Sequence, residues 1–230
     1  MKKGIQPSGM ATRQKILSAS LKIFLEKGYE GTTAKEVAQR AEIVNGSPFF
    51  QFGNKEGVLL ELVKQIFSRQ FQVSQDYLGP NAGPLLLYAA HTGLQFHITE
   101  LSAPLRELYV MAYTLKSTAE FIYQDMTPRL IRTFQSYLPD AQPKNFYELG
   151  IASAGIARGY MDRPCDLYFT LEQKLRLYYA CCFKLYEVPP EHYLPVIERA
   201  LALDLHGLAE KFVQDAITQS DAGFQAAMAH

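Results

Sequence analysis

Apolar residues recur at helical spacing along almost the whole chain. Within residues 12–27, Ile16, Ala19, Ile23 and Phe24 fall on one stripe, and charged side chains occupy the other faces. This spacing of three to four residues predicts an amphipathic helix. Similar segments follow to the C-terminal region, and none of useful length alternates with the two-residue period of a strand. The sequence therefore predicts an all-α fold.

Glycines and prolines divide the later helices. Gly79-Pro80, Gly83-Pro84 and Pro189-Pro190 mark joints, because neither residue type continues a helix well. Beyond residue 53 the expected helices are 54–78, 84–101, 104–116, 118–138, 144–161, 170–187 and 190–216. Residues 217–230 are expected to form a frayed tail.

The segment from Thr32 to Leu59 predicts a different arrangement, two short helices joined by a tight turn. Thr33 and Glu36 have the spacing of a capping box, in which each side chain bonds the other's backbone amide. The turn falls at residues 41–44, and a helix is expected to start at Asn45, with Pro48 in its first turn. Two such helices bury little core of their own, and proteins usually build them to place one helix in the DNA major groove.

Residues 13–62 resemble the DNA-binding domain of the TetR family of bacterial transcriptional regulators. The matching positions keep their spacing without a gap and include Phe24, Gly28-Tyr29, Thr32-Thr33, Val37-Ala38, Gly46-Ser47, Phe49, Phe52 and Lys55-Glu56. The resemblance covers about a quarter of the chain. It implies a helix-turn-helix DNA-binding domain over residues 1–53 and a helical effector-binding and dimerisation domain over residues 54–216.

The resemblance also implies which residues meet DNA. Val44 to Gln51 would enter the major groove, while Thr33 and Lys55 would contact phosphate on either side. The predicted DNA-binding residues are Thr32, Thr33, Val44, Asn45, Gly46, Ser47, Pro48, Phe49, Phe50, Gln51 and Lys55. Core packing is the alternative interpretation for Phe49 and Phe52, and a solvated charge is the alternative for Lys55.

Two departures from the family pattern mark this domain as atypical. Glu42 stands where the family commonly has glycine, so a left-handed turn there would cost about 1 kcal/mol. Phe49 lacks the hydroxyl of the tyrosine usual near that position, and few Lys or Arg lie on the reading helix. We therefore expect weaker non-specific DNA affinity than a recognition helix rich in Lys and Arg would give. A protein-binding regulator that keeps the fold but has weakened DNA contact is the alternative function.

Aromatic and polarisable residues concentrate in the middle helices, where an ordinary helical core would carry Leu, Ile and Val. Together with the family resemblance, this predicts a cavity between residues 60 and 160 for a small apolar or aromatic effector. Ordinary core packing remains the alternative for each residue taken singly. The predicted ligand-binding residues are Phe67, Phe71, His91, Phe96, Tyr109, Tyr113, Phe121, Tyr123 and Arg158.

A single helix-turn-helix covers too few base pairs for specificity, so we expect a homodimer on a pseudo-palindromic operator in double-stranded DNA. Small residues near 152–155 would let two helices approach closely, and the next helix would complete a four-helix interface. The last long helix is a rival for this role. The predicted interface residues are Ala152, Gly155, Leu171, Leu175, Tyr178 and Cys182.

Composition narrows the function further. The chain of 230 residues has no net charge, but the charges are unevenly distributed. Residues 1–64 carry an excess of four positive charges, and the remainder carries an excess of four negative charges. This asymmetry is expected if only the N-terminal part contacts DNA phosphates. Three cysteines, an odd number, form no disulfide framework, and the first residues lack a secretory apolar segment, so we expect a cytoplasmic protein without a membrane span. No metal, cofactor or catalytic set is indicated, so an enzyme is not expected. The sequence predicts a ligand-responsive dimeric regulator, a repressor released by its effector.

Overall fold

The structure is a computed structural model, and it describes residues 7–43 and 47–228. Within these residues it has ten α-helices, one short 3-10 helix and no strand, which confirms the predicted all-α fold. The helices are α1 (Pro7–Lys27), α2 (Ala34–Arg40), η1 (Phe50–Phe52), α3 (Lys55–Leu78), α4 (Pro84–Leu101), α5 (Ala103–Thr114), α6 (Lys116–Phe134), α7 (Pro143–Asp162), α8 (Leu171–Leu185), α9 (Pro190–Leu201) and α10 (Leu205–Met228). None of the helices in the described part is long and apolar enough to cross a bilayer.

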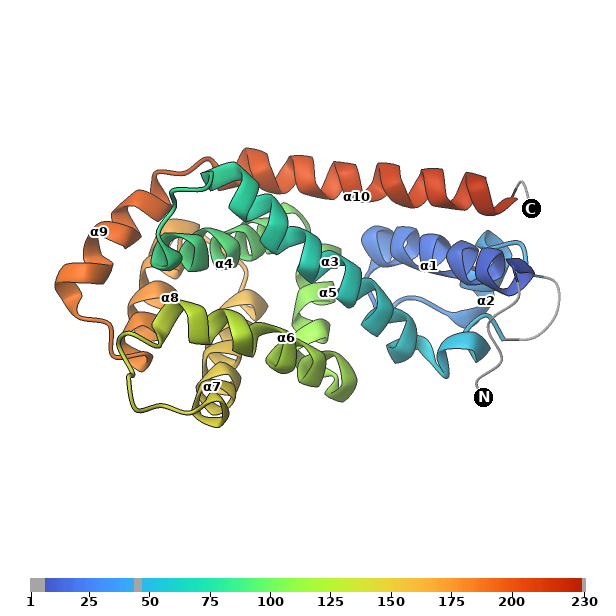
Figure 1. Cartoon of the computed structure of the whole chain (residues 1–230). Coiled ribbons are helices and arrows are strands. Elements are labelled where there is room, and N and C mark those ends of the chain that lie inside the picture. The colour runs from blue at the N-terminus through green and yellow to red at the C-terminus, as the bar shows by residue number, and fades with distance from the viewer. Residues whose placement is uncertain (1–6, 44–46, 229–230) are drawn as a thin grey trace.

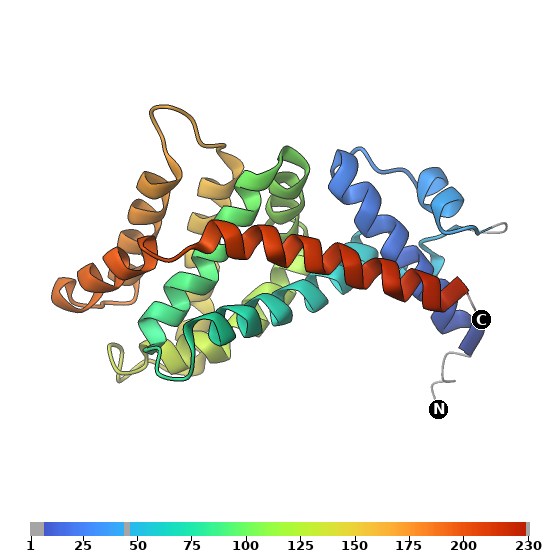
Figure 2. The same ribbon diagram turned by 90° about the horizontal axis from the view of Figure 1, so that it is seen from above.

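The molecule is elongated, with α1, α2 and η1 at one end and the larger group of helices at the other (Figures 1 and 2). Helix α3 belongs to both parts, since it contacts α1 and η1 in the smaller part and α4 and α6 in the larger part. The Asn54 side chain caps α3 by accepting the Gly57 amide at 2.8 Å. A helix that runs from one part into the other can transmit a tilt between them.

Aromatic side chains fill the core of the larger part. The rings of Phe134 and Tyr186 stack at 4.0 Å between centroids, and Tyr88 meets Phe134 edge-on at 5.1 Å. The Tyr179 hydroxyl donates to the Ala89 carbonyl oxygen at 2.8 Å, which satisfies a polar group deep in this core. Much of the aromatic enrichment seen in the sequence therefore serves packing.

The C-terminal region differs from the sequence prediction in two ways. The expected helix 190–216 is two helices, because the Asp204 side chain accepts the Gly207 amide at 3.0 Å and so caps a new start. The expected frayed tail over 217–230 is also wrong for its described residues, since α10 continues to Met228.

Helix α10 extends alongside α1 and α4, and so links the two parts of the molecule (Figure 2). Lys22 of α1 pairs with Asp221 at 2.6 Å, and the Ser18 hydroxyl donates to the Ser220 carbonyl oxygen at 2.9 Å. Arg69 of α3 pairs with Asp215 at 3.6 Å, and Ala227 near the end of α10 is buried. These contacts are tertiary, so helical periodicity alone could not reveal them.

Candidate DNA interface and central pocket

The start of α2 has the predicted capping box. Thr33 Oγ1 accepts the Glu36 amide at 3.3 Å, and the Glu36 carboxylate accepts the Thr33 amide at 3.1 Å. The hydrogen bond from Lys27, followed by those from Thr33, lowers the pKa of Glu36 to about 2. The free amides of the first turn of α2 remain available to phosphate.

The turn after α2 requires a left-handed residue, and Glu42 occupies that position with φ of 55°. The amide of Ile43 donates to the Ala38 carbonyl oxygen at 2.9 Å, which closes the end of the helix. The expected strain at Glu42 is therefore confirmed. The predicted contacts of Val44, Asn45 and Gly46 fall outside the described residues.

Residues 47–53, here called the reading segment, do not form the α-helix that was predicted from Asn45. They fold as a turn and the three-residue helix η1, which ends at Gly53 with φ of 80°. The Gly53 amide donates to the Phe50 carbonyl oxygen at 3.3 Å, and the positive φ of Gly53 ends the helix directly after Phe52. Ser47, Phe50 and Gln51 are exposed, whereas Pro48 and Phe49 are buried.

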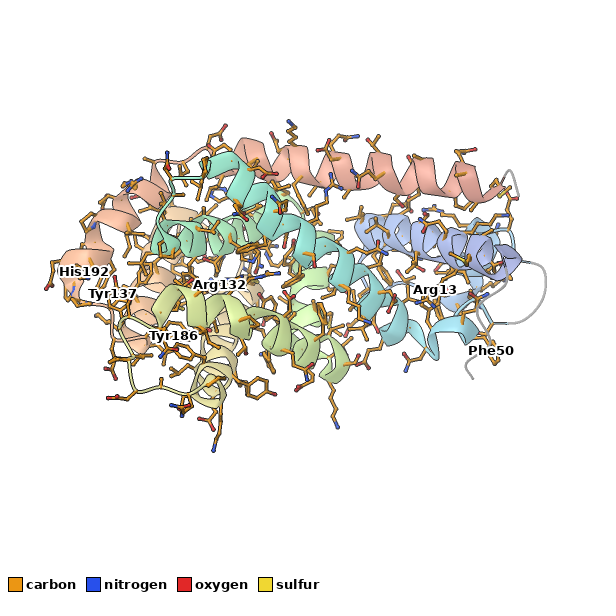
Figure 3. The ribbon with its side chains drawn as sticks, viewed as in Figure 1. Arg13, Phe50, Arg132, Tyr137, Tyr186 and His192 are labelled. Atoms are coloured by element: carbon orange, nitrogen blue, oxygen red, sulfur yellow. The ribbon has the colours of Figure 1, made fainter. Side chains whose placement is uncertain are left out.

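Phe50 is the most conspicuous side chain of this segment, since it is 85% exposed and projects from the end of the molecule (Figure 3). Phe49 lies in the core, as its alternative interpretation proposed. The described reading segment thus presents an apolar ring with neutral polar groups and no Lys or Arg, as the sequence led us to expect.

Two predicted DNA-binding residues, Lys55 and Thr32, have internal partners in the structure. Lys55 Nζ donates to the carbonyl oxygens of Tyr29 at 2.9 Å and Thr32 at 3.1 Å, and it lies 4.4 Å from the centre of the Tyr29 ring. Thr32 is buried, and its hydroxyl donates to the Gly28 carbonyl oxygen at 2.7 Å. Both residues fix the loop before α2, and a DNA contact by either stays a prediction.

Arg13 positions the reading segment, a role that the sequence gave no reason to assign. Its Nη1 donates to the Gln51 carbonyl oxygen at 3.1 Å, its guanidinium lies 4.0 Å from the centre of the Phe52 ring, and it pairs with Glu61 at 2.9 Å. On α1 it looked like any other surface charge, because its partners become neighbours only after folding.

Two carboxylates join the N-terminal part to the larger part. Glu56 accepts the Ser117 amide at 2.9 Å and the Ser117 hydroxyl at 2.5 Å, at the first turn of α6. These hydrogen bonds lower the pKa of Glu56. Glu107 of α5 accepts the Glu30 amide at 2.7 Å. A side chain at Gly28, where φ is 85°, would collide with the Glu107 carboxylate, so glycine is required there for two reasons.

A cavity of about 260 Å³ lies between α3, α4, α6, α7 and α8. Four predicted ligand-binding residues line it, namely Phe67, Phe71, His91 and Tyr113. This volume lies just below the roughly 300–1,000 Å³ of typical ligand clefts, which suits a small organic molecule.

The other five predicted ligand-binding residues do not line this cavity. Phe96 is fully buried against Tyr178, and Tyr109 is buried with its ring 6.2 Å from that of Phe67. Phe121 packs on the core, and Tyr123 meets Tyr147 edge-on at 6.3 Å. Arg158 is exposed and donates to Thr114 Oγ1 at 2.7 Å. Aromatic content alone therefore did not distinguish the residues that line the cavity from those that pack in the core.

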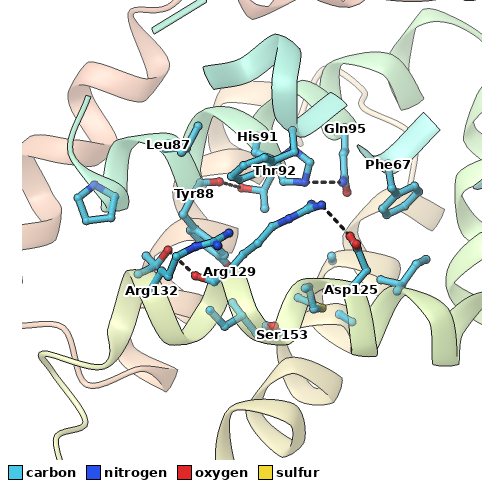
Figure 4. A pocket seen from close by; sticks show the side chains of 18 of the residues that line it. Phe67, Leu87, Tyr88, His91, Thr92, Gln95, Asp125, Arg129, Arg132 and Ser153 are labelled. Carbon is cyan, nitrogen blue, oxygen red and sulfur yellow. Dashed lines mark hydrogen bonds and ion pairs between the residues drawn. The ribbon is translucent and has the colours of Figure 1, made fainter. Parts of the chain in front are cut away.

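The charged lining of the cavity comes from α6 and was missed in the sequence. Asp125, Arg129 and Arg132 follow one another at spacings of four and three residues, which places them on one helix face. Figure 4 shows both arginines in the space between α6 and α4. A search for charged residues at helical spacing, opposite the aromatic positions of α4, could have found them.

Hydrogen bonds order the polar wall of the cavity (Figure 4). Tyr113 donates to Gln95 Oε1 at 2.8 Å, and Gln95 Nε2 lies 3.4 Å from His91 Nε2. Burial, and secondarily the charge of Arg129, lowers the pKa of His91 to about 3, so this ring is neutral at pH 7.

The predicted dimer residues divide between surface and core. Ala152 and Gly155 are exposed on α7, and Leu171 is half-buried. Leu175, Tyr178 and Cys182 are enclosed within the protomer, where burial raises the pKa of the Cys182 thiol to about 11. The exposed face of α8 carries Leu177 and Cys181 instead. The apolar residues predicted on α8 do share one face, but that face points into the protomer.

Within the described residues no group of three or more His, Cys, Asp or Glu side chains is placed to hold a metal ion. A capped α2, a turn and an exposed reading segment follow one another in the order of a helix-turn-helix DNA-binding domain, with the second helix shortened to η1. The family model described as bacterial regulatory proteins, tetR family, matches residues 16–62. Over these residues the chain is similar to the DNA-binding domain of the tetR transcriptional regulators.

Two curated proteins are similar to parts of this chain. The HTH-type transcriptional regulator YvkB of Bacillus subtilis is 32% identical over 68 residues, which are 30% of this chain and 36% of YvkB. The HTH-type transcriptional repressor KstR2 of Mycobacterium tuberculosis is 24% identical over 163 residues, which are 67% of this chain and 72% of KstR2.

Two solved structures share the fold. SmeT, the repressor of the Stenotrophomonas maltophilia multidrug efflux pump SmeDEF, superposes with a TM-score of 0.53 at 20% identity, over 75% of this chain and 88% of SmeT. A gamma-butyrolactone receptor described as ArpA-like superposes with a TM-score of 0.50 at 16% identity, over 83% of this chain and 96% of that one.

Proposed function

We propose that the chain is a dimeric transcriptional repressor whose affinity for its operator falls when a small molecule occupies the central cavity. The observation that carries this proposal is the hydrogen-bonded link between Glu56 and Ser117. Ser117 belongs to α6, the helix that also carries the charged lining of the cavity.

The link leads directly to the DNA-binding part. Glu56 follows Lys55, whose ammonium group holds the carbonyl oxygens of Tyr29 and Thr32 just before α2. A ligand that displaces α6 would therefore move the start of α3 and the loop before α2 together. Only a ligand with different affinities for the two arrangements can shift their populations. The names of KstR2 and SmeT, both repressors, favour negative regulation.

The exposed face of α7 and α8 supports the dimer. Ile151 is 40% exposed and Leu177 48% exposed. Ala152 and Gly155 are also exposed, and a Cβ at Gly155 would meet nothing within 4 Å, which leaves space for a close approach. A two-fold pair through this face would present two reading segments to half-sites roughly 34–36 Å apart.

The test is binding of the dimer to DNA from upstream of its own gene, measured by fluorescence anisotropy over a range of salt concentrations. We expect binding at low salt that weakens as salt rises, because phosphate contacts release counterions. Replacing Phe50 and Gln51 together by alanine should reduce affinity about tenfold or more, whereas the control K144A on exposed α7 should not change it.

A regulator that binds a protein rather than DNA is the second candidate, and one observation favours it. Phe50 offers an exposed apolar ring where a basic reader would carry a positive charge. Absence of binding to the upstream DNA even at low salt would favour this candidate and contradict the repressor.

A further inference from the structure

The central cavity carries one positive charge that no protein group balances. Three charged side chains line it, Asp125, Arg129 and Arg132, and His91 is neutral at pH 7. Arg129 pairs with Asp125 at 2.9 Å. Arg132 has no carboxylate within 4 Å in the described part of the chain. A single negative charge on the ligand would complete the balance.

Arg129 is held in place before any ligand arrives. Its guanidinium lies 4.3 Å from the centre of the Phe71 ring, and only 20% of its side chain is exposed. Burial lowers the pKa of this guanidinium, while the charge of Asp125 opposes that change. A planar guanidinium has five N–H donors, and one carboxylate partner leaves several of them unused.

Arg132 lies one turn farther along α6 and is exposed at the edge of the cavity. The positive charge of Arg132 lowers the pKa of Arg129, so the two guanidinium groups repel each other across this edge. An anion between them would relieve that repulsion and accept charge-assisted hydrogen bonds from both, which are about twice as strong as neutral ones.

The rest of the lining is apolar or neutral. Phe67, Phe71, Ile122, Met126 and Leu130 contribute apolar surface, and Gln95 and Tyr113 provide neutral polar groups at the α4 and α5 side. A cationic ligand would be repelled by the net positive charge of the lining. A doubly charged phosphate would leave the occupied cavity with a net negative charge.

We propose that the cavity binds an organic acid with a single carboxylate, held between Arg129 and Arg132, and a small apolar body that packs against Phe67, Phe71 and Met126. This inference rests on the proposed function in that it names the effector class of the same cavity. Its test measures binding to the protein without DNA, so it can fail independently of operator binding.

The test is isothermal titration calorimetry with two series of probes, each with one body and different head groups. One series is decanoate, decanol, decylamine and decyl phosphate, and the other carries the same four head groups on a phenylbutyl body. In the series whose body fits, we expect the carboxylate to bind about tenfold or more tightly than the alcohol, with the amine weakest.

The variant R132M should bring the carboxylate and the alcohol to nearly equal affinity and leave alcohol binding unchanged, since Arg132 is exposed and has no protein partner to lose. The matched control is R158M, which removes an arginine outside the cavity and should retain the preference. Circular dichroism would verify that both variants fold.

Equal affinity for carboxylate and alcohol, a preference for the amine or the phosphate, or an R132M variant that keeps the carboxylate preference would each overturn the proposal. No binding in either series would overturn it too. Acid binding that leaves operator affinity unchanged would support the site and contradict the sensing role in the proposed function.

Discussion

At the scale of single residues, the structure holds a few residues in states that an isolated chain would disfavour, such as a left-handed backbone or a buried neutral histidine at a lowered pKa. Glu42 has the left-handed backbone that its family usually gives to glycine, and the His91 ring is neutral inside a positively charged cavity. Arg13 holds the reading segment through the Gln51 carbonyl oxygen. Glu42 and the buried histidines each support a measurable prediction about stability.

Replacing Glu42 by glycine should stabilise the protein by about 0.5–1 kcal/mol. The substitution removes about 1–2 kcal/mol of left-handed strain, and the extra freedom of glycine in the unfolded chain offsets part of the gain. Denaturant unfolding measures the difference. The control E42A removes the carboxylate but keeps the Cβ, so it should change stability little. If E42A stabilised as much as E42G, charge rather than backbone strain would be the cause.

Acidification from pH 7 to 5 should lower the free energy of unfolding, and His91 and His97 should contribute to the loss. Burial first, and then the charge of His206, lowers the pKa of His97 to about 4, while Asp204 and Glu100 oppose the change. Burial and Arg129 lower that of His91 to about 3. Both values lie below the roughly 6.5 of an unfolded histidine, so between these limits the unfolded state binds protons that the folded state does not.

The variant H97Q should therefore flatten the pH dependence by about one proton in this window. Carboxyl groups contribute little above pH 5, which makes the window specific for histidine. An unchanged slope in H97Q would contradict the neutral assignment of this ring.

At the scale of helices, the periodic pattern predicted the long elements well and the irregular ones poorly. Helices such as α4 and α7 follow from their apolar spacing and from the prolines that begin them. The reading segment does not, since Pro48 and Gly53 lie within six residues of each other and leave only η1. The predicted helix ended at residue 216, whereas α10 continues to Met228. The last turns of α10 pack against α1, and the local sequence pattern does not reveal that partner.

The site could be predicted only in part for the same reason. The sequence prediction included four residues that line the cavity, namely Phe67, Phe71, His91 and Tyr113. The family resemblance located the predicted DNA-binding domain at the N-terminal end. Arg129 and Arg132 were overlooked, because a charge on an amphipathic helix is usually solvated. Leu175, Tyr178 and Cys182 were placed on the wrong side of α8, since an apolar stripe does not tell a core from an interface.

Ending the chain after Ala216 should loosen α1 without unfolding the larger part. The truncation removes the Lys22–Asp221 ion pair and the Ser18–Ser220 hydrogen bond and exposes the α1 face that α10 covers. Hydrogen exchange followed by mass spectrometry should show faster exchange in α1 and little change in α5–α8. The variant K22A is the control, because one exposed ion pair is worth less than about 1 kcal/mol. Unchanged exchange in α1 would show that α10 does not support it.

At the scale of the whole molecule, a DNA-binding end and a cavity are connected by α3, α6 and α10. Glu56 and Ser117 join the start of α3 to the start of α6, and α10 covers both parts from the other side (Figures 1 and 2). Control of the DNA-binding end from the cavity requires this connection. Specific recognition requires a second copy of the chain, which we place on the exposed face of α7 and α8.

The variant G155R should convert the dimer to a monomer. A side chain at Gly155 meets nothing within 4 Å inside the protomer, so arginine there can fold normally but would block a close helix approach. Size-exclusion chromatography with light scattering measures the mass, and G155A should remain dimeric. A G155R protein that stayed dimeric would place the interface on another surface.

The most direct test of control through α6 is the operator affinity of the wild-type dimer and of E56Q, each with and without the carboxylate that calorimetry shows to bind best. In the wild type we predict tight binding to the upstream DNA at low salt and affinity about tenfold weaker with the acid, a coupling of about 1.4 kcal/mol. E56Q weakens the Ser117 link, so it should bind acid and DNA but respond less. A wild-type protein that does not bind the DNA, or whose affinity the bound acid leaves unchanged, would contradict this control.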